Sequence, residues 1–493
     1  MKSFDKHYLW IMFLQLLAVW VFINYSLPLS IRLDESQSLW QTSFSIRELL
    51  ISLSQNVHVP LYHLLVHGVQ VVFDNSIFIS RAFSFVFYLI SVPVFYGLGA
   101  YIYGRNTAFF ATTLYGISPF LVWFSSEIRM YTMLILVTIL VHFFYLRLMR
   151  EPTTLTWWAY AVCCLLGIYT HYFFFLVLLS HFVFFFGTMR KNFTQGQLLP
   201  FLAIVLLVIA AFLPWLLKVF SGEGVEESQP ILNPPTSIDI FNVFSNFFFG
   251  FQVDAINSII LACWPILLVL LFLGLNKKSA PRPETRFLWV ATLVPLLCAY
   301  LISVLYQPLF LSRYLIIVLP PLFLLIARLG DVYAPTAAFF YKTTLVLCMA
   351  LGLVVQLKSP DTPNKENYSA ASSYLSSAVG GEDIVVVSAP FIVYPILYYY
   401  TGPAKITTLP QWNRNTEKII PDFDIDNLPN EVAAIAGTHE RLYLVLSYDQ
   451  GYEDSIKSYF DATFDREESL EFSRDVHVYV YRLRYDMDYT LTN

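Results

Sequence analysis

The chain has 493 residues, of which 57% are hydrophobic and only 13% are charged. Soluble domains are typically about half apolar and about one quarter charged, so this composition excludes an ordinary soluble enzyme and predicts a polytopic membrane protein. The formal net charge of −5 conceals an asymmetry, because residues 361–493 carry 21 acidic and 10 basic side chains. We therefore expect a membrane-embedded part followed by an acidic, water-exposed C-terminal domain.

The first hydrophobic run covers about residues 8–27 and is long enough to cross a bilayer. No small-residue cleavage site follows it, so we expect a retained signal anchor and not a signal peptide. The acidic pair Asp34-Glu35 stands a few residues beyond this run. Charge next to a bilayer is costly, and we therefore treat the pair as a candidate functional feature.

A shorter apolar run from Pro60 to Phe73 contains His63, His67 and Gln70. It has too few residues for a crossing, so we expect an interfacial or re-entrant helix. Residues 28–78 would then form one large outer loop, with amphipathic helices lying on the membrane around the acidic pair.

Ten further apolar runs follow the first, and together they predict eleven transmembrane helices. These runs are 79–101, 107–125, 130–147, 156–170, 172–188, 199–217, 257–275, 287–305, 312–328 and 337–357. The stretch 155–188 is split at Thr170-His171, because one helix of that length would be about 51 Å long. With the N-terminus inside, lysine and arginine gather in the inside loops, and the outside loop 218–256 is mainly acidic. Eleven spans then place the C-terminal domain outside.

The C-terminal part opens with a linker rich in proline, aspartate and asparagine at 359–364. Strand-like runs follow at 384–388, 442–447 and 476–482, and Ala370–Ala378 has a helical pattern. About 130 residues suffice for a separate core. We therefore expect a transmembrane part over 1–358 and a small extracytoplasmic α/β domain over 359–493.

Metal and disulfide chemistry is not expected. All five cysteines lie in apolar runs, so no disulfide framework or zinc site is predicted in the water-exposed parts. His63 and His67 have a helical spacing that suits a metal pair, but no carboxylate signature accompanies them. Asp422, Asp424 and Asp426 alternate like cation ligands, yet the glycine and late glutamate of a calcium loop are missing, which favours a solvated acidic turn. We expect neither a metal site nor a cofactor.

With this topology, unusual polar residues from separate segments fall on the outer face. They are Asp34, Glu35, His58, Glu127, Arg129, Tyr131, His171, Tyr172, Arg313 and Tyr314. Convergence from distant segments is what a catalytic site needs, whereas structural charges would not all lie on one face.

The ordered motifs resemble a known family. In chain order they are Asp34-Glu35, His58-Val-Pro-Leu-Tyr62, Ser118-Pro119 with Glu127-Ile-Arg-Met-Tyr131, Thr170-His-Tyr172, and Ser312-Arg-Tyr314 with Pro320-Pro321. This set is similar to the bacterial and archaeal membrane glycosyltransferases related to protein O-mannosyltransferases and the aminoarabinose transferase of lipid A. The resemblance covers about residues 8–330 and departs at His58-Val59-Pro60, where close relatives often show Lys-Pro-Pro or Pro-Pro. It implies the glycosyltransferase C fold, a polyprenyl-phosphate-linked sugar donor, and reaction at the outer face of the plasma membrane.

The resemblance assigns the general base that takes the acceptor proton to Asp34, and we include the adjacent Glu35 as a catalytic candidate in a supporting role. Desolvation or the adjacent acid would raise the pKa of the Asp34 carboxyl and make it a stronger base. The alternative is that the pair caps a juxtamembrane helix beginning near Ser36, because aspartate is a good N-cap.

Arg129 and Arg313 are the best candidates to bind the donor phosphate, since a guanidinium pairs with phosphate oxygens and keeps its charge. The alternative is an interfacial arginine that reaches lipid head groups. Further donor-binding candidates are His58, Tyr131 and Tyr314, and supporting candidates are Glu127, His171 and Tyr172. Glu127 stands where it would neutralise or orient Arg129, and a histidine near an aromatic belt is more often a packing residue.

We expect an inverting glycosyltransferase that moves a hexosyl or pentosyl group from a polyprenyl-phosphate donor to an acceptor hydroxyl. The alternative is a transporter or flippase of a lipid-linked saccharide, but transporters place ionisable groups near the bilayer midplane and often show inverted repeats. Here the polar residues gather at one face and no repeat is visible. Expected partners are the lipid-linked donor, a protein, lipid or polysaccharide acceptor and membrane lipids, without nucleic acid, and we expect a monomer.

Overall fold

The computed structural model describes residues 6–56, 58–74, 76–188, 195–221, 233–252, 256–258, 282–358, 366–417, 419–437 and 439–483. The chain divides into two compact units. Of the described residues, 6–28, 45–221, 233–252, 256–258 and 282–358 belong to the first unit, and 29–44 with 366–483 belong to the second.

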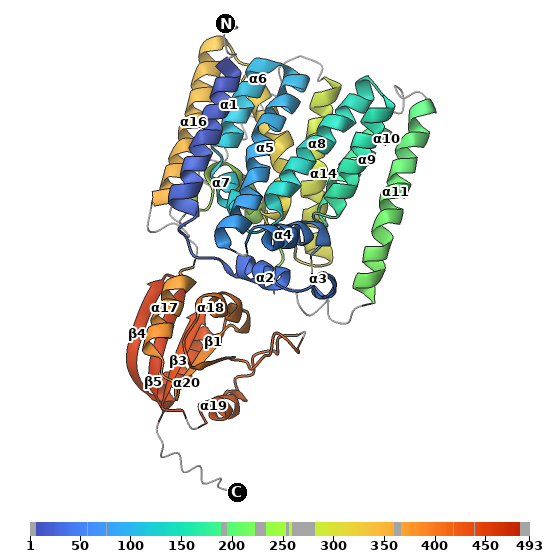
Figure 1. Ribbon diagram of the computed structural model, residues 1–493. Coiled ribbons are helices and arrows are strands. Elements are labelled where there is room, and N and C mark those ends of the chain that lie inside the picture. The colour runs from blue at the N-terminus through green and yellow to red at the C-terminus, as the bar shows by residue number, and fades with distance from the viewer. Residues whose placement is uncertain are drawn as a thin grey trace. The chain divides into compact units, whose positions relative to one another are not determined.

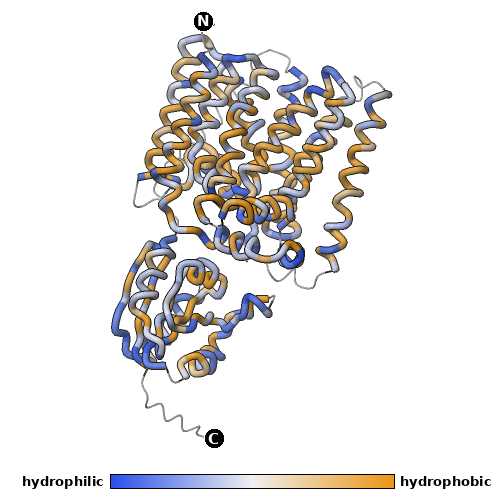
Figure 2. Tube along the Cα trace, in the orientation of Figure 1, coloured by the Kyte–Doolittle hydropathy of each residue, from blue (hydrophilic) through white to orange (hydrophobic). Residues whose placement is uncertain are grey.

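The first unit is a bundle of apolar helices, with two short helices lying crosswise at one end (Figure 1). The two crosswise helices are α3 (Ile46–Ser54) and α4 (Pro60–Val72). The others described are α1 (Lys6–Val21), α5 (Ile77–Tyr103), α6 (Arg105–Gly116), α7 (Pro119–Ser125), α8 (Tyr131–Arg150), α9 (Thr154–Ile168), α10 (Phe174–Thr188), α11 (Gln195–Phe220), α12 (Ser237–Phe249), α14 (Pro283–Leu305), α15 (Leu319–Leu329) and α16 (Pro335–Lys358). Apolar residues predominate along most of the length of these helices, as Figure 2 shows. Helix α11, for example, exposes Leu199, Leu206 and Leu217. A helix that is apolar all round and still exposed is typical of a membrane span.

Within the described residues, six helices are long and apolar enough to cross a membrane, and a seventh is added if the bent pair α6–α7 is one span. The shorter apolar helices α9, α10 and the segment Tyr314–Leu329 coincide with three more of the predicted runs. The predicted run 257–275 lies outside the described residues except for residues 257 and 258, as does the predicted linker 359–364. The count of eleven spans therefore stays a prediction.

The first unit contains one break that was predicted and one bend that was not. Helix α9 ends at Ile168 and α10 begins at Phe174, so the split at Thr170-His171 is confirmed. The run 107–125, predicted as one span, is instead bent by 59° between α6 and α7. Pro119 starts the new helix there, and the Ser118 hydroxyl accepts a hydrogen bond from the Leu121 N–H at 3.4 Å. Because proline lacks an N–H and its ring clashes with the preceding turn, it favours a kink or break at this point.

The second unit contains a five-stranded mixed sheet. Its strands are β1 (Ile384–Ser388), β2 (Lys405–Thr408), β3 (Arg441–Ser447), β4 (Asp465–Ser473) and β5 (Val476–Arg482), in the spatial order β2-β1-β3-β5-β4. Strands β2, β1 and β3 are parallel, and β5 pairs antiparallel with both β3 and β4. The three predicted strands correspond to β1, β3 and β5, so the small α/β domain is confirmed.

Alternate residues of the central strands face two separate cores. Val385 and Val387 of β1 pack with α17 (Tyr368–Ala378) and α18 (Val393–Tyr399). Ile384 and Val386 pack with α19 (Leu428–Ala436) and α20 (Glu453–Thr463). The period of two in a strand places these side chains on opposite faces, so a run of buried β-branched residues is explained by helices covering both sides.

The segment Leu29–Phe44 belongs to the second unit although it follows the first membrane helix in the chain. It contains α2 (Leu33–Thr42), and the side chains of Leu33 and Trp40 pack against the core of α17, α18 and the sheet. The expected domain boundary near residue 358 had assigned this segment to the membrane part. The helix that carries Asp34 is thus grouped with the C-terminal domain.

Candidate active site

Arg129 and His58 meet in the first unit, although 71 positions separate them in the sequence. The Nη1 atom of Arg129 lies 3.0 Å from Nε2 of His58. Arg129 follows α7 in a tight turn in which its N–H donates to the Glu127 carbonyl at 2.7 Å, and His58 precedes Pro60 at the start of α4. Arg129 is only 3% exposed. A buried guanidinium placed at an element end is suited to bind an anion.

Aromatic contacts join three predicted residues from distant segments, namely Tyr131 of α8, His171 of the α9–α10 turn and Tyr314 of the segment before α15. The rings of Tyr131 and His171 lie 6.4 Å apart between centroids, and those of His171 and Tyr314 lie 5.3 Å apart. Phe173 completes the cluster at 5.1 Å from Tyr314. Three segments far apart in the sequence therefore meet through aromatic contacts.

Arg313 belongs to the same cluster. Its guanidinium carbon lies 5.5 Å from the centroid of the Tyr314 ring, within the range of a cation–π interaction. The neighbouring Ser312 accepts a hydrogen bond at 2.9 Å from the Asn246 amide of α12, which fixes the loop that carries Arg313. Arg313 is thus tied to the rings of His171 and Tyr314, and Arg129 is tied to the ring of His58.

The supporting candidates have structural partners. The Tyr172 hydroxyl accepts a hydrogen bond from the Trp215 indole N–H at 3.1 Å. The Tyr169 carbonyl accepts one from the Leu61 N–H at 3.1 Å, which ties the α9–α10 turn to the start of α4. The Phe173 N–H donates to Nδ1 of His171 at 3.1 Å, so that nitrogen acts as an acceptor and the ring orientation is fixed. Glu127 is 2% exposed.

The acidic pair lies in the second unit, in the first turn of α2. Glu35 is fully buried, and its carboxylate accepts a hydrogen bond from the Arg32 N–H at 3.0 Å, which caps the start of the helix. Asp34 is half-buried. The helix begins at Leu33 and not near Ser36, so within the pair the capping contact belongs to Glu35.

The contacts therefore join the predicted residues of the first unit in two sets, one of His58, Glu127 and Arg129 and one of Tyr131, His171, Tyr314 and Arg313. Tyr172 lies in the same turn as His171 and contacts Trp215. Asp34 and Glu35 lie in the other unit.

Comparisons with known proteins give the same picture of the fold. Two structures of ArnT from Cupriavidus metallidurans, one bound to undecaprenyl phosphate and one in the apo state, match with TM-scores of 0.61 and 0.62. Sequence identity is 12% and 11%, and the matches cover 96% and 97% of this chain and 98% of each ArnT chain. The protein has the glycosyltransferase C fold.

Two further comparisons agree with this fold. The family model described as dolichyl-phosphate-mannose-protein mannosyltransferase matches residues 57–217, a range that includes His58, Arg129 and His171. The archaeal oligosaccharyltransferase AglB from Archaeoglobus fulgidus, in complex with an inhibitory peptide and a dolichol-phosphate, matches with a TM-score of 0.50 at 10% identity, over 88% of this chain and 69% of that chain. No curated protein sequence matches the chain. The resemblance noted in the motifs is confirmed.

The sequence analysis did not identify several charged residues whose side chains make long-range contacts in this fold. Arg81 of α5 is fully buried and donates through Nη1 to the carbonyls of Ser26 and Leu27, each at 3.1 Å, where the chain leaves the first span. A single arginine inside an apolar run was the available signal. Arg32 and Glu366 form an ion pair at 3.3 Å in the second unit, and no local pattern could have paired residues 334 positions apart.

Proposed function

We propose that the protein transfers a sugar from a polyprenyl-phosphate donor to an acceptor hydroxyl at the outer face of the plasma membrane. The observation that carries this proposal is the buried Arg129, held against His58 within the region that matches the mannosyltransferase family model. The ArnT structure with a similar fold contains undecaprenyl phosphate, which supports a lipid-phosphate donor.

The donor phosphate is bound by Arg129 and Arg313. Negative charge grows on this phosphate as the bond to the sugar breaks, and a fixed guanidinium in a water-poor environment stabilises that charge strongly. His58 orients Arg129 through its ring nitrogen, and the rings of His171 and Tyr314 hold the loop that carries Arg313. Tyr131 lines the same cluster.

Asp34 is the general base. The acceptor oxygen forms a bond to the anomeric carbon while the bond from that carbon to the phosphate oxygen breaks, and the acceptor proton passes to the Asp34 carboxylate. The polyprenyl phosphate leaves with the electron pair of the broken bond. Because the acceptor attacks the donor directly, the sugar inverts its configuration. Asp34 lies in the first turn of α2, where the partial positive charge of the helix end favours a negatively charged side chain.

Glu35 supports this base instead of sharing its task. Its buried carboxylate accepts the Arg32 N–H and so shapes the first turn in which Asp34 stands. A carboxylate engaged in this way is suited to fix a helix start and not to exchange a proton with an arriving acceptor.

The test is the surface chemistry of a strain of the source organism from which the gene has been deleted. Mass spectrometry of surface glycans and glycolipids from this strain is expected to show the loss of one sugar, and the wild-type gene on a plasmid is expected to restore it. The missing sugar would identify the donor and acceptor class together. A full complement of glycans in the deletion strain would contradict the proposal.

The same strain distinguishes a transferase from a flippase. A flippase defect would leave the lipid-linked saccharide on the inner face and reduce every glycan made from it, whereas a transferase defect removes one linkage and lets the donor accumulate. We expect the second result, and a reduction of every glycan made from this donor, with the donor retained on the inner face, would favour the flippase.

A further inference from the structure

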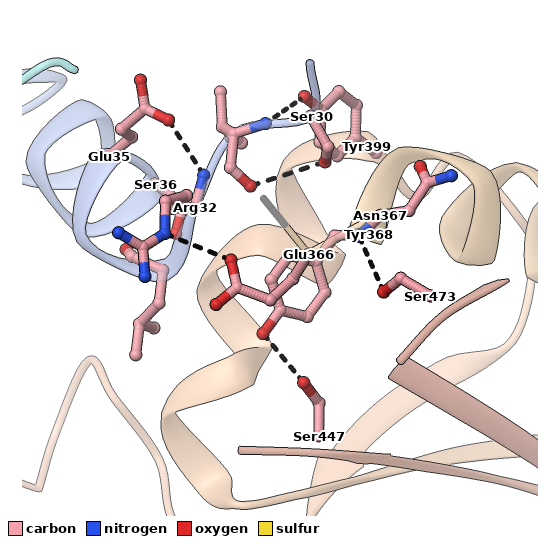
Figure 3. A network of polar contacts seen from close by, with 12 residues as sticks. Ser30, Arg32, Glu35, Ser36, Glu366, Asn367, Tyr368, Tyr399, Ser447 and Ser473 are labelled. Atoms are coloured by element: carbon pink, nitrogen blue, oxygen red, sulfur yellow. Dashed lines mark hydrogen bonds and ion pairs between the residues drawn. The ribbon is translucent and has the colours of Figure 1, made fainter. Parts of the chain in front are cut away.

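The segment that leads into α2 contacts the C-terminal domain through polar groups of Ser30, Ile31 and Arg32 (Figure 3). The Ser30 hydroxyl accepts a hydrogen bond from the Ser369 N–H at 3.2 Å, and the Ile31 N–H donates to the Tyr399 hydroxyl at 2.9 Å. Nε of Arg32 lies 3.3 Å from Oε2 of Glu366. Three consecutive residues at the start of the helix are therefore held by α17, α18 and the chain just before α17.

The other end of α2 is held by aromatic and cationic contacts within the same unit. The ring of Trp40 lies 5.0 Å from that of Tyr394 of α18. The Arg414 guanidinium lies over both rings, at 5.4 Å from Trp40 and 5.2 Å from Tyr394. Burial raises the pKa of the Tyr394 hydroxyl to about 12, so this side chain stays uncharged beside the guanidinium. Contacts at both ends fix the axis of the helix and its rotation about that axis.

Glu366 is itself anchored to the sheet. Its side chain is only 9% exposed, and its carbonyl accepts a hydrogen bond from the Tyr368 N–H at 3.0 Å. The Tyr368 hydroxyl lies 3.0 Å from the Ser447 hydroxyl at the end of β3, and the Asn367 N–H donates to the Ser473 hydroxyl of β4 at 3.2 Å. Burial and the neighbouring Glu366 charge raise the pKa of Tyr368. The partner of Arg32 thus moves with the sheet.

We propose that the C-terminal domain positions the Asp34 carboxylate, with Arg32 and Glu366 as the positioning pair, a step that rests on the proposed function of Asp34. Arg32 is the residue just before the helix, its N–H is held by Glu35, and its side chain is held by Glu366. Asp34 follows two residues later in the first turn. A base must lie within hydrogen-bonding reach of the acceptor hydroxyl, so a small change in the orientation of this turn reduces the rate of transfer.

The test uses full-length Glu366→Gln and Arg32→Gln, with Arg466→Gln as the matched control. Arg466 forms an ion pair with Asp461 at 3.0 Å that joins β4 to α20 in the same domain. The functional readout is the initial rate at which an induced plasmid copy restores the missing glycan in the deletion strain. Misplacement of a catalytic group by about 1 Å costs up to about a hundredfold in rate, and we expect Glu366→Gln to reduce the rate about tenfold or more while Arg466→Gln leaves it unchanged.

Two further measurements separate positioning from general damage. Hydrogen–deuterium exchange of the purified full-length protein is expected to increase in residues 33–42 for Glu366→Gln, and binding of undecaprenyl phosphate is expected to be unchanged. The double variant Arg32→Glu with Glu366→Arg restores an ion pair of opposite polarity and is expected to recover most of the rate.

The inference is overturned if Glu366→Gln behaves like Arg466→Gln, or if exchange in residues 33–42 increases while the rate of transfer is unchanged. Failure of the proposed function would look different. In that case Asp34→Asn would restore the glycan as well as the wild-type gene does, whatever the result for Glu366→Gln.

Discussion

At the scale of single residues, the contact between Arg129 and His58 fixes the protonation of the histidine. A guanidinium only donates hydrogen bonds, so Nε2 of His58 must accept at 3.0 Å, and its proton is carried on Nδ1. The ring is therefore neutral in this contact. A neutral histidine does not repel the guanidinium of Arg129, whereas a protonated ring would.

The phosphate-binding assignment predicts a loss of affinity in Arg129→Gln. Hydrogen bonds to charged groups contribute about 1.5–3 kcal/mol, so binding of undecaprenyl phosphate to the purified protein is expected to weaken about tenfold or more. The control is Arg150→Gln, at the far end of α8, the helix that follows Arg129, where Arg150 pairs with Glu284. We expect its affinity to match the wild type. Equal affinities for the two variants would contradict the assignment.

At the scale of elements, the end of α12 depends on a glycine. Gly250 has a φ of +71°, a conformation that side chains rarely adopt, and an added Cβ would lie 1.9 Å from Oε1 of Gln356. That oxygen accepts the Phe251 N–H at 3.0 Å, while the Gln356 amide donates to the Pro119 carbonyl at 3.0 Å. One side chain of α16 thus ties the end of α12 to the start of α7.

Gly250→Ala is therefore expected to destabilise the membrane unit. The backbone conformation alone costs about 1–3 kcal/mol for a residue with a Cβ, and displacement of Gln356 breaks the contacts to Phe251 and Pro119 as well. The measurement is the midpoint of thermal unfolding in detergent. Gly97→Ala in α5 serves as the control, because nothing lies within 4 Å of its added Cβ and alanine favours a helix. A midpoint for Gly250→Ala equal to that of Gly97→Ala would refute this explanation.

The sequence was most informative about elements and about residues near their ends. Hydrophobic runs located most of the described helices, and the strands β1, β3 and β5 were recognised because their apolar residues are continuous or alternate. Strand β4 was missed because it is an exposed edge strand rich in charge, with Asp465, Arg466, Glu467 and Glu468 in succession. The bend at Pro119 was missed because hydropathy is the same on both sides of it.

The candidate site was predicted in part. Its members in the first unit stand at helix ends and carry charge or aromatic rings, which local patterns reveal. The contacts that position them are long-range, as between His58 and Arg129, or between Asn246 and Ser312. Hydropathy also could not show that α2 packs with a domain that begins more than 300 residues later, because that depends on Leu33 and Trp40 finding a particular surface.

At the scale of the whole molecule, the chain combines a membrane unit with the glycosyltransferase C fold and an α/β unit that includes α2. The proposed phosphate ligands belong to the first unit and the proposed base belongs to the second. We therefore expect transfer to require both units, and binding of the lipid phosphate to require only the first.

The most direct test of this account is Asp34→Asn, which removes the proposed base and preserves the size of the side chain. The variant is expected to bind undecaprenyl phosphate as the wild type does and to unfold at the same temperature. In the deletion strain it is expected to restore none of the missing glycan, as judged by mass spectrometry at matched expression. Restoration of that glycan to the wild-type level would contradict the assignment of Asp34 as the catalytic base.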